Sequence, residues 1–216
     1  MRLSKLRHFA PGYPSLSMLC LMVCSLILAS CSPITVNDYA GNKPKIVMEQ
    51  FFDGPLTAHG VVKDRSGKVI RSFNATIDAS WEQGVGTLDE QFIFDDGEQQ
   101  QRIWQLTKTA EGRYIGTAND VVGEGEINVA GNSVFLDYIL RIDYQGEPLD
   151  LRIDDRMYLT SDNVMINEST MTKWGFNVGL IYNESKGAII HELKLICLTG
   201  EIALGANPVI STQYSI

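Results

Sequence analysis

Two pairs of adjacent carboxylates are the first residues in this sequence that could carry out acid–base chemistry: Asp95-Asp96 and Asp154-Asp155. A glycosidase needs two carboxyl groups that face each other across a substrate. Neighbouring side chains on a strand point to opposite faces, so neither pair forms such a dyad by itself. Gly97 follows Asp95-Asp96, and Asp and Gly are preferred in tight hairpin turns. We therefore interpret Asp95-Asp96 as part of a turn.

Asp155 differs because it falls on the apolar face of an alternating segment, between Ile153 and Met157. Burying an unpaired carboxylate is costly, so Asp155 needs a partner. The candidate partners on nearby segments are Arg141, Arg152 and Arg156. A buried ion pair or a position at the rim of the fold would explain this residue, and ligand binding is the alternative.

Aromatic side chains are the other candidate feature. Several of them occupy the apolar faces of alternating segments: Phe73, Trp81, Phe92, Phe94, Trp104, Tyr114, Phe135 and Tyr138. Inside a small β-barrel such side chains either plug the core or line a cavity for one small ligand. A plugged core is the simpler interpretation. If there is a cavity, we expect Trp81, Trp104, Tyr138 and Asp155 to contact the ligand.

The sequence carries no familiar catalytic or metal-binding motif. Two histidines lie beyond the N-terminal segment, His59 and His191, and neither belongs to a His-x-x-x-His or Cys-x-x-Cys pattern. A zinc site needs about four such ligands at suitable spacing. There is no Gly-x-Ser-x-Gly elbow for a nucleophilic serine. We therefore predict no metal, no cofactor and no catalytic residue, and we expect a protein that is not an enzyme.

The N-terminal residues have the features of an export signal. Arg2, Lys5 and Arg7 precede an apolar run over residues 16–28. That run is short for a bilayer-spanning helix, which needs roughly 20 apolar residues. It matches the apolar region of a cleaved signal peptide instead.

The run ends in Leu28-Ala29-Ser30-Cys31, which resembles the lipobox of bacterial lipoprotein signals. The resemblance implies cleavage between Ser30 and Cys31, and attachment of acyl chains such as palmitate to Cys31. The alternative is an ordinary signal peptide that places a cysteine here by coincidence. The next residue is Ser32 rather than Asp, which implies sorting to the Gram-negative outer membrane, on its periplasmic face.

Cysteine usage and charge fit an exported, acidic protein. Cys20 and Cys24 lie in the signal and Cys31 is the lipidation site, so Cys197 alone remains and no intramolecular disulfide can form. Loss of the signal removes three basic residues and no acidic ones, and the formal net charge falls from −8 to −11. Nucleic-acid binding normally requires a basic patch, so we expect no nucleic-acid partner. We expect a monomer.

From Leu56 onward, apolar and polar residues alternate with a period of two, which is typical of strands with one buried face. The clearest example is residues 68–81, where Phe73, Ile77 and Trp81 share one face. Gly-containing turns separate about eight to ten such segments, so consecutive strands should be antiparallel neighbours. We predict an all-β fold, a single antiparallel up-and-down β-barrel or half-barrel.

These patterns divide the chain into four parts. Residues 1–30 are the signal peptide, and residues 31–45 are the lipidated cysteine with a polar tether that could hold the body away from the membrane. Residues 46–179 form the barrel domain, in which residues 47–52 begin as a short helix or strand. Residues 180–216 lose the alternation and are an atypical C-terminal tail.

Several stretches in order also resemble a known family. They include Phe52-Asp53-Gly54-Pro55, Asp154-Asp155-Arg156-Met157-Tyr158 and Lys173-Trp174-Gly175. The chain resembles a family of proteobacterial lipoproteins, the domain of unknown function three-eight-three-three. The resemblance implies a lipocalin-like β-structure in the cell envelope, and no activity. The family pattern ends soon after Lys-Trp-Gly with one more short strand. Here an unrelated sequence begins at Leu180, so we hypothesise a frameshift or a divergent end, with the closing strand missing or rebuilt.

Together these observations favour a non-enzymatic lipoprotein of the outer membrane whose barrel binds a small apolar or lipid-like ligand or an envelope partner. An assembly or structural role in the envelope is the alternative. A hydrolase that uses Asp154, Asp155 or Asp120 at the mouth of a cavity is a weaker one.

Overall fold

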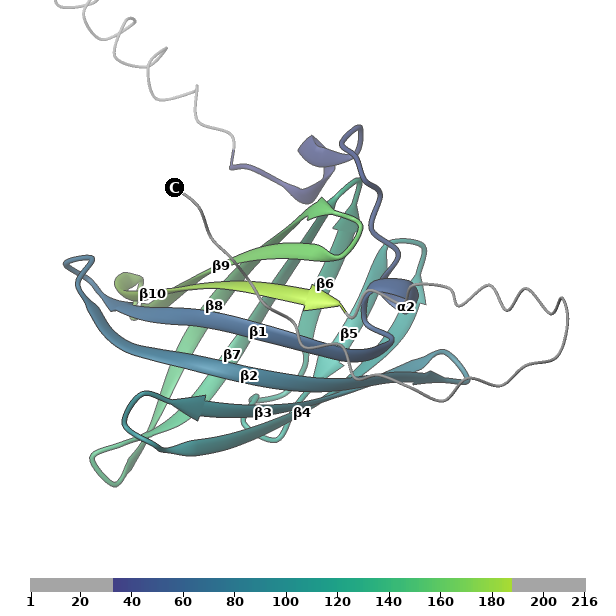
Figure 1. Cartoon of the computed structure of the whole chain (residues 1–216). Helices are drawn as coiled ribbons and strands as arrows, with labels where there is room; N and C mark the ends of the chain where they lie inside the picture. Colours follow the sequence, from purple (N-terminus) through teal and green to yellow (C-terminus); the bar gives the residue numbers. More distant parts are fainter. Residues whose placement is uncertain (1–32, 188–216) are drawn as a thin grey trace, which may run out of the picture.

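The computed structural model describes residues 33–187, and these form one β-barrel with two short helical segments before it (Figure 1). The helical segments are η1 (Val36–Tyr39), a 3-10 helix, and α2 (Met48–Phe51). The ten strands are β1 (Gly54–Asp64), β2 (Val69–Glu82), β3 (Val85–Phe94), β4 (Gln99–Ala110), β5 (Arg113–Thr117), β6 (Gly125–Ala130), β7 (Ser133–Tyr144), β8 (Glu147–Ser161), β9 (Val164–Lys173) and β10 (Phe176–Gly187).

Each strand pairs antiparallel with the next one in the sequence, and β10 pairs with β1, so the barrel is closed. Closure leaves no strand edge exposed. The predicted up-and-down barrel is confirmed, and the half-barrel alternative is wrong. Asp95-Asp96-Gly97 forms the tight turn between β3 and β4, as the sequence predicts, with Gly97 at a φ of 84°.

The C-terminal boundary of the barrel lies later than the sequence predicts. Residue 179 falls inside β10, and residues 180–186 pair with β9 while residues 179–187 pair with β1. The closing strand is therefore present, and the expectation that it is missing is wrong. Alternation is hard to see in β10 because two of its three cavity-lining residues, Asn183 and Ser185, are polar, and only Ile181 is apolar. The rest of the predicted tail, residues 188–216, lies outside the described residues.

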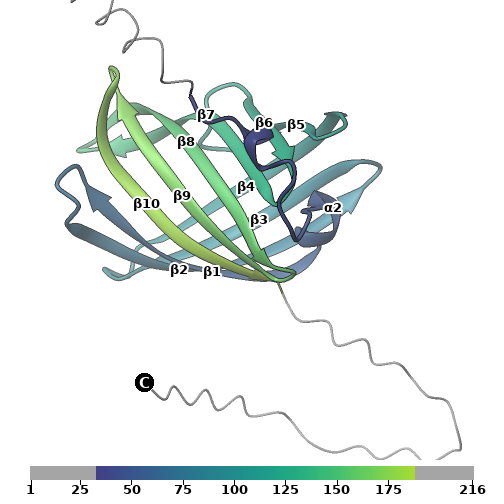
Figure 2. The same ribbon diagram turned by 90° about the horizontal axis from the view of Figure 1, so that it is seen from above.

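The predicted tether also differs from the structure. Within residues 33–45, η1 packs against the outer wall of the barrel beside β6 and β7, and Tyr39 and Ile34 also contact β8. Figure 2 shows this segment crossing the strands. The ring of Tyr39 contacts the outward-facing rings of Phe135 and Tyr158, at centroid distances of 5.7 and 5.3 Å. Gly131 lies directly against the Tyr39 carbonyl, where no side chain would fit. This stretch is therefore part of the folded body.

α2 closes one end of the barrel. Its Met48 and Phe51 are buried, together with the following Phe52. The indole N–H of Trp81 donates a hydrogen bond to the Phe52 carbonyl over 2.8 Å. Glu49 accepts hydrogen bonds from Tyr114 over 2.8 Å and from Lys108 over 3.1 Å. Apolar contacts inside and polar contacts at the rim thus hold α2 across this end.

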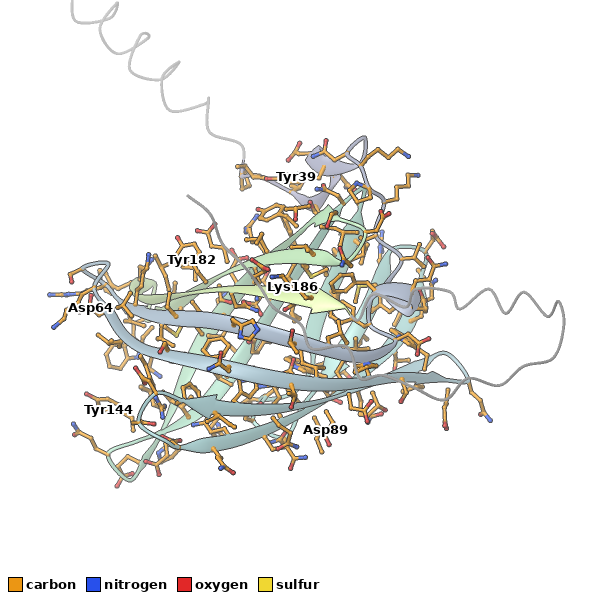
Figure 3. All side chains as sticks on the ribbon, in the orientation of Figure 1. Tyr39, Asp64, Asp89, Tyr144, Tyr182 and Lys186 are labelled. Atoms are coloured by element: carbon orange, nitrogen blue, oxygen red, sulfur yellow. The ribbon has the colours of Figure 1, made fainter. Side chains whose placement is uncertain are left out.

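The opposite end carries the β1–β2, β3–β4, β7–β8 and β9–β10 turns and has no helix over it (Figure 1). Asp64 and Tyr144 lie together at this end in Figure 3. We call it the open end. In the part of the chain that the structure describes, no helix has the length and apolar character to cross a membrane.

Candidate binding cavity

A cavity of about 640 Å³ occupies the barrel interior between α2 and the open end. Strand alternation creates it, because every second side chain points inward. Its inner part is apolar and is lined by Met48, Phe52, Ile77, Leu88, Trp104, Leu106, Ile127, Val134, Leu136, Leu140, Leu151 and Met165. The interior is therefore hollow, and the simpler expectation of a fully plugged core is wrong. This volume is in the range of small-molecule sites, roughly 300–1,000 Å³.

A belt of polar side chains crosses this apolar interior. Its members come from β3, β4, the β5–β6 connection, β7, β8 and β9: Glu90, Arg102, Asp120, Tyr138, Asp155, Asn167 and Ser169. Arg102 is the cation of the belt. Its Nε lies 3.0 and 2.9 Å from the two carboxylate oxygens of Asp120, and its Nη2 lies 2.8 Å from Asp120 Oδ2. The Arg102 guanidinium thus forms a salt bridge with Asp120 through both its Nε and its Nη2.

Asp155 sits deep in the belt and is only 7% exposed. Burial raises its pKa from 3.8 to about 6, although Ser169, Arg102 and Tyr138 act in the opposite direction. Among the described residues its Oδ1 has no hydrogen-bond partner. A buried acceptor without a donor costs about 1–3 kcal/mol, so this oxygen opposes the stability of the empty barrel.

Glu90 and Tyr138 share the environment of Asp155. Burial raises the pKa of Glu90 from 4.5 to about 7, against the attraction of Arg102 and with added repulsion from Asp155. Glu90 is partly exposed, but it lines the cavity, so the space it faces is enclosed by the barrel. Burial also raises the pKa of Tyr138 well above its usual range, and the charge of Asp155 adds to that shift.

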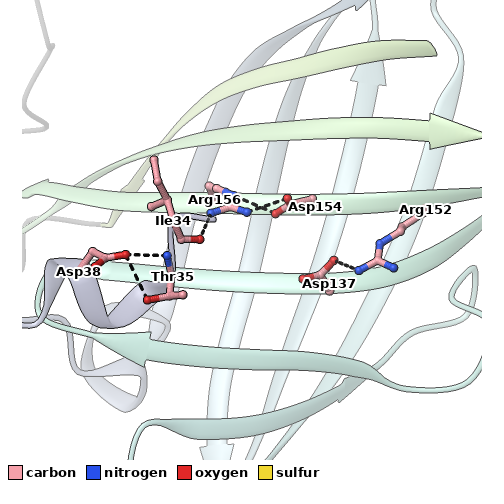
Figure 4. Close-up of polar contacts among 7 residues, drawn as sticks. All are labelled: Ile34, Thr35, Asp38, Asp137, Arg152, Asp154 and Arg156. Atoms are coloured by element: carbon pink, nitrogen blue, oxygen red, sulfur yellow. Dashed lines mark hydrogen bonds and ion pairs between the residues drawn. The ribbon is translucent and has the colours of Figure 1, made fainter. Parts of the chain in front are cut away.

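The prediction that Arg141, Arg152 or Arg156 pairs with Asp155 is wrong, because each of these arginines binds another carboxylate. Arg141 binds Asp150, with Nε 2.7 Å from Oδ1, and Arg152 binds Asp137 over 2.8 Å. Arg152 lies three residues before Asp155 and Arg156 lies one residue after it. Because side chains alternate along a strand, both arginines point to the opposite face of β8 from Asp155. There Arg156 binds Asp154 over 2.8 Å and also contacts the Ile34 carbonyl (Figure 4).

Three of the four predicted ligand contacts lie together. Trp104, Tyr138 and Asp155 all line the cavity, and the rings of Trp104 and Tyr138 meet edge to face with their centroids 5.2 Å apart. Trp81 does not line the cavity. It packs over Gly86 at the closed end, where a side chain at residue 86 would collide with its ring, and it holds α2 by the hydrogen bond described above.

Sequence reasoning missed Glu90 and Arg102, and it considered Asp120 only as a carboxylate of a hydrolase. The signal was present for Glu90 and Arg102. Glu90 interrupts an apolar face between Leu88 and Phe92, as Asp155 does on β8, and Arg102 precedes Trp104 on the inward face of β4. Asp120 lies in the irregular β5–β6 connection, where no periodicity indicates direction.

At the open end the cavity narrows beneath Arg71. The Arg71 guanidinium lies 3.6 Å from the centroid of the Phe94 ring and binds Asp96 over 2.9 Å and Glu98 over 2.6 Å. These contacts tie β2 to the β3–β4 turn. They define the mouth from β2, β3 and β4, with Arg141 and Asp143 of β7 on the other side.

Within residues 33–187, no three His, Cys, Asp or Glu side chains are grouped so that they could hold a metal ion. Ser30 and Cys31, the predicted cleavage and lipidation residues, lie outside the described residues. The structure therefore tests the predicted cavity residues, and lipidation of Cys31 stays a prediction.

A closed ten-stranded meander with one capped end and a mainly apolar interior defines a lipocalin-like, up-and-down class of barrel. The chain belongs to the family described as "Protein of unknown function (DUF3833)", which it matches over residues 25–184. That match ends inside β10, so the family's residues include most of the closing strand.

Comparison with solved structures gives a similar chain titled "Structure of S-type Phycobiliprotein Lyase CPES from Guillardia theta". It is 12% identical, with a TM-score of 0.46, and the alignment covers 71% of this chain and 96% of that one. No curated protein matches this sequence.

Proposed function

We propose that this protein binds a small apolar or amphiphilic molecule inside its barrel and carries or stores it. The cavity of about 640 Å³ inside the barrel, open at one end, is the observation that supports this function. Most of its lining is aliphatic or aromatic, with the polar belt across it and further polar groups at its mouth. That combination is typical of ligand pockets, in which apolar walls provide affinity and a few polar groups fix orientation.

Binding is better supported than hydrolysis. A hydrolase that uses Asp154 and Asp155 as a pair would need both carboxylates on one side of β8. Asp154 lies on the outer wall and binds Arg156, whereas Asp155 lines the cavity. The two carboxylates therefore cannot act together on one substrate, although they are neighbours in the sequence.

The open end is the expected entrance for the ligand. Most of the exposed large apolar side chains of the described residues lie on its turns and strand ends: Val69, Ile70, Ile93, Val122, Tyr144, Trp174, Phe176 and Val178. The other end is covered by α2. An amphiphile reaching the barrel would meet apolar surface first at the mouth of the cavity.

The predicted lipobox supplies a location for this activity. As part of the proposal, Cys31 holds the barrel at the outer membrane, on its periplasmic face, where lipids and other amphiphiles are abundant. Ile34, three residues after the predicted anchor, already accepts a hydrogen bond from Arg156 on the outer wall of β8. The proposal therefore leaves no long spacer between the anchor and the barrel.

Filling the cavity tests the proposal. Ala58 points inward on β1, opposite Ala75 and Ser185, so the side chain of Ala58→Phe would extend into the cavity. Its neighbour Thr57 is exposed on the outer face, which makes Thr57→Phe the matched control. We expect the neutral apolar probe N-phenylnaphthylamine to bind the full chain and the control, and to bind Ala58→Phe at least tenfold more weakly. Equal binding by both variants, at equal folded content by circular dichroism, would contradict the proposal.

A further inference from the structure

The charges that line the cavity do not balance. Five carboxylates and three arginines line it, and no lysine or histidine does. The carboxylates are Glu90, Glu98, Asp120, Asp143 and Asp155, and the arginines are Arg71, Arg102 and Arg141. The cavity is therefore a region of negative potential when its carboxylates are ionised.

Each of these arginines is already paired. Arg102 binds both oxygens of Asp120, Arg71 binds Asp96 and Glu98, and Arg141 binds Asp150 through two nitrogens. A carboxylate or phosphate entering the cavity would find the charge of each arginine already compensated by a carboxylate. It would also meet repulsion from Glu90 and Asp155, so the interior is unsuited to an anionic head group.

The unsatisfied polar atoms indicate the opposite kind of ligand. Asp155 Oδ1 and Asn167 Oδ1 are buried acceptors that line the cavity, and neither has a hydrogen-bond donor among the described residues. The one buried donor without a partner, Arg71 Nε, lies at the mouth, where its guanidinium stacks on Phe94. The interior itself thus offers spare acceptors.

We propose that the cavity selects an amphiphile with an apolar tail and a cationic, hydrogen-bond-donating head group of the alkylammonium class. This inference rests on the proposed binding function. The tail occupies the apolar inner part beside Leu136 and Trp104, and the head group donates to Asp155 Oδ1. An ammonium group supplies up to three donors and a compensating positive charge.

Three probes with one tail and different heads test this inference on the full chain: dodecylamine, dodecanol and dodecanoate, by titration calorimetry at about pH 8. We expect dodecylamine to bind at least tenfold more tightly than dodecanoate, with dodecanol between them. In Asp155→Asn that preference should fall about tenfold. In the matched variant Asp154→Asn, on the outer face of the same strand, it should be unchanged.

The wild-type chain provides a second readout that needs no variant. Dodecylamine should bind more weakly at about pH 5 than at about pH 8, because Asp155 and Glu90 then become protonated and lose charge. Dodecanol should show little change. Inside the barrel, the charged and titratable groups that act on Asp155 are Glu90, Arg102 and Tyr138, and Asp120 acts in turn on Glu90 and Tyr138. Asp154 acts on Asp155 from the outer face of β8.

The outcomes separate the two proposals. Tight binding of dodecanoate, or a preference for dodecylamine that survives Asp155→Asn, would overturn the head-group inference and leave the binding function standing. If none of the three probes binds, the binding function fails, and this inference fails with it.

Discussion

The carboxylate of Asp155 occupies a position that opposes its own ionisation. It is buried on the inward face of β8, its Oδ1 has no donor among the described residues, and burial raises its pKa from 3.8 to about 6. Such a group makes the folded state less stable when it is charged. Its presence in a largely apolar interior is better explained by a ligand than by the stability of the barrel alone.

The first prediction concerns Asp155→Asn and pH. Because the folded pKa is raised, ionisation of Asp155 costs nothing below about pH 4, and the cost grows as pH rises through about 6. We expect Asp155→Asn to be similar in stability to the wild type near pH 4 and more stable at about pH 8, by about 2–3 kcal/mol. Urea unfolding across this pH range measures the difference. A constant difference, or one that shrinks as pH rises, would rule out the strained carboxylate.

Trp174 is a second residue in an unfavourable position. It begins the turn between β9 and β10 with a φ of 50°, followed by Gly175 at 82°, and it is 87% exposed. This hairpin turn prefers Asn-Gly, and a left-handed conformation costs most residues about 1–2 kcal/mol. The Lys173 amine lies 5.4 Å from the Trp174 ring, a contact worth only about 0.5–1 kcal/mol at an exposed site.

We therefore expect Trp174→Asn to raise the free energy of unfolding by about 0.5 kcal/mol. Trp174→Leu is the control, because it removes the ring without relieving the backbone. Thermal unfolding of the three chains gives the comparison. Both variants lack the ring, so a Trp174→Asn chain no more stable than Trp174→Leu would contradict the role given to the turn geometry.

At the scale of elements, β10 completes the hydrogen bonding of the barrel. It pairs along most of its length with both β9 and β1. Without it, two long strands would have unpaired edges, and such edges promote aggregation. The strand therefore determines whether the meander is a closed barrel or an open sheet.

This leads to a test with two truncations. A chain ending after Trp174 should lose cooperative unfolding and aggregate, because β1 and β9 are left as edges. A chain ending after Gly187 retains all ten strands and should unfold cooperatively, at a temperature close to that of the full chain. Calorimetry and size-exclusion chromatography measure both properties. Cooperative unfolding of the shorter chain would contradict the role of β10 as the closing strand.

Strand alternation made most of this architecture predictable. On each strand, apolar residues at every second position, such as Phe73 and Ile77 on β2 or Leu140 on β7, form the inward face. Turns that contain glycine, such as Gly97, form the hairpins. The end of the barrel was not predictable in this way, because the inward face of β10 carries the polar residues Asn183 and Ser185. The packing of residues 33–45 was hidden too, since it depends on Tyr39 meeting Phe135 and Tyr158 from distant strands.

Part of the site was predictable by the same rule. Asp155, Trp104 and Tyr138 stand out on apolar faces, and Glu90 carries the same signal on β3. The pairing of Arg102 with Asp120 joins residues 18 positions apart through an irregular connection. The cavity exists because ten strands close into one barrel. No single segment of the sequence shows either the number of strands in the barrel or its closure.

At the scale of the whole molecule, the lipid anchor remains a prediction with a direct test. We expect wild-type protein in Gram-negative cells to incorporate labelled palmitate and to fractionate with the outer membrane. Cys31→Ala should incorporate no palmitate and should no longer fractionate with the outer membrane. Cys197→Ala should behave as the wild type. Palmitate labelling of the Cys31→Ala chain would contradict the assignment of Cys31 as the acylated residue.

The central claim is that the barrel holds an amphiphile, and native mass spectrometry tests it most directly. The full chain carrying Cys31→Ala, purified from envelope extracts without added lipid, should show a bound species at a one-to-one ratio. The same chain with Ala58→Phe should lack that species, and the chain with Thr57→Phe should retain it. An empty wild-type barrel, or a bound species that persists with equal occupancy in Ala58→Phe, would contradict the claim that the cavity is the binding site.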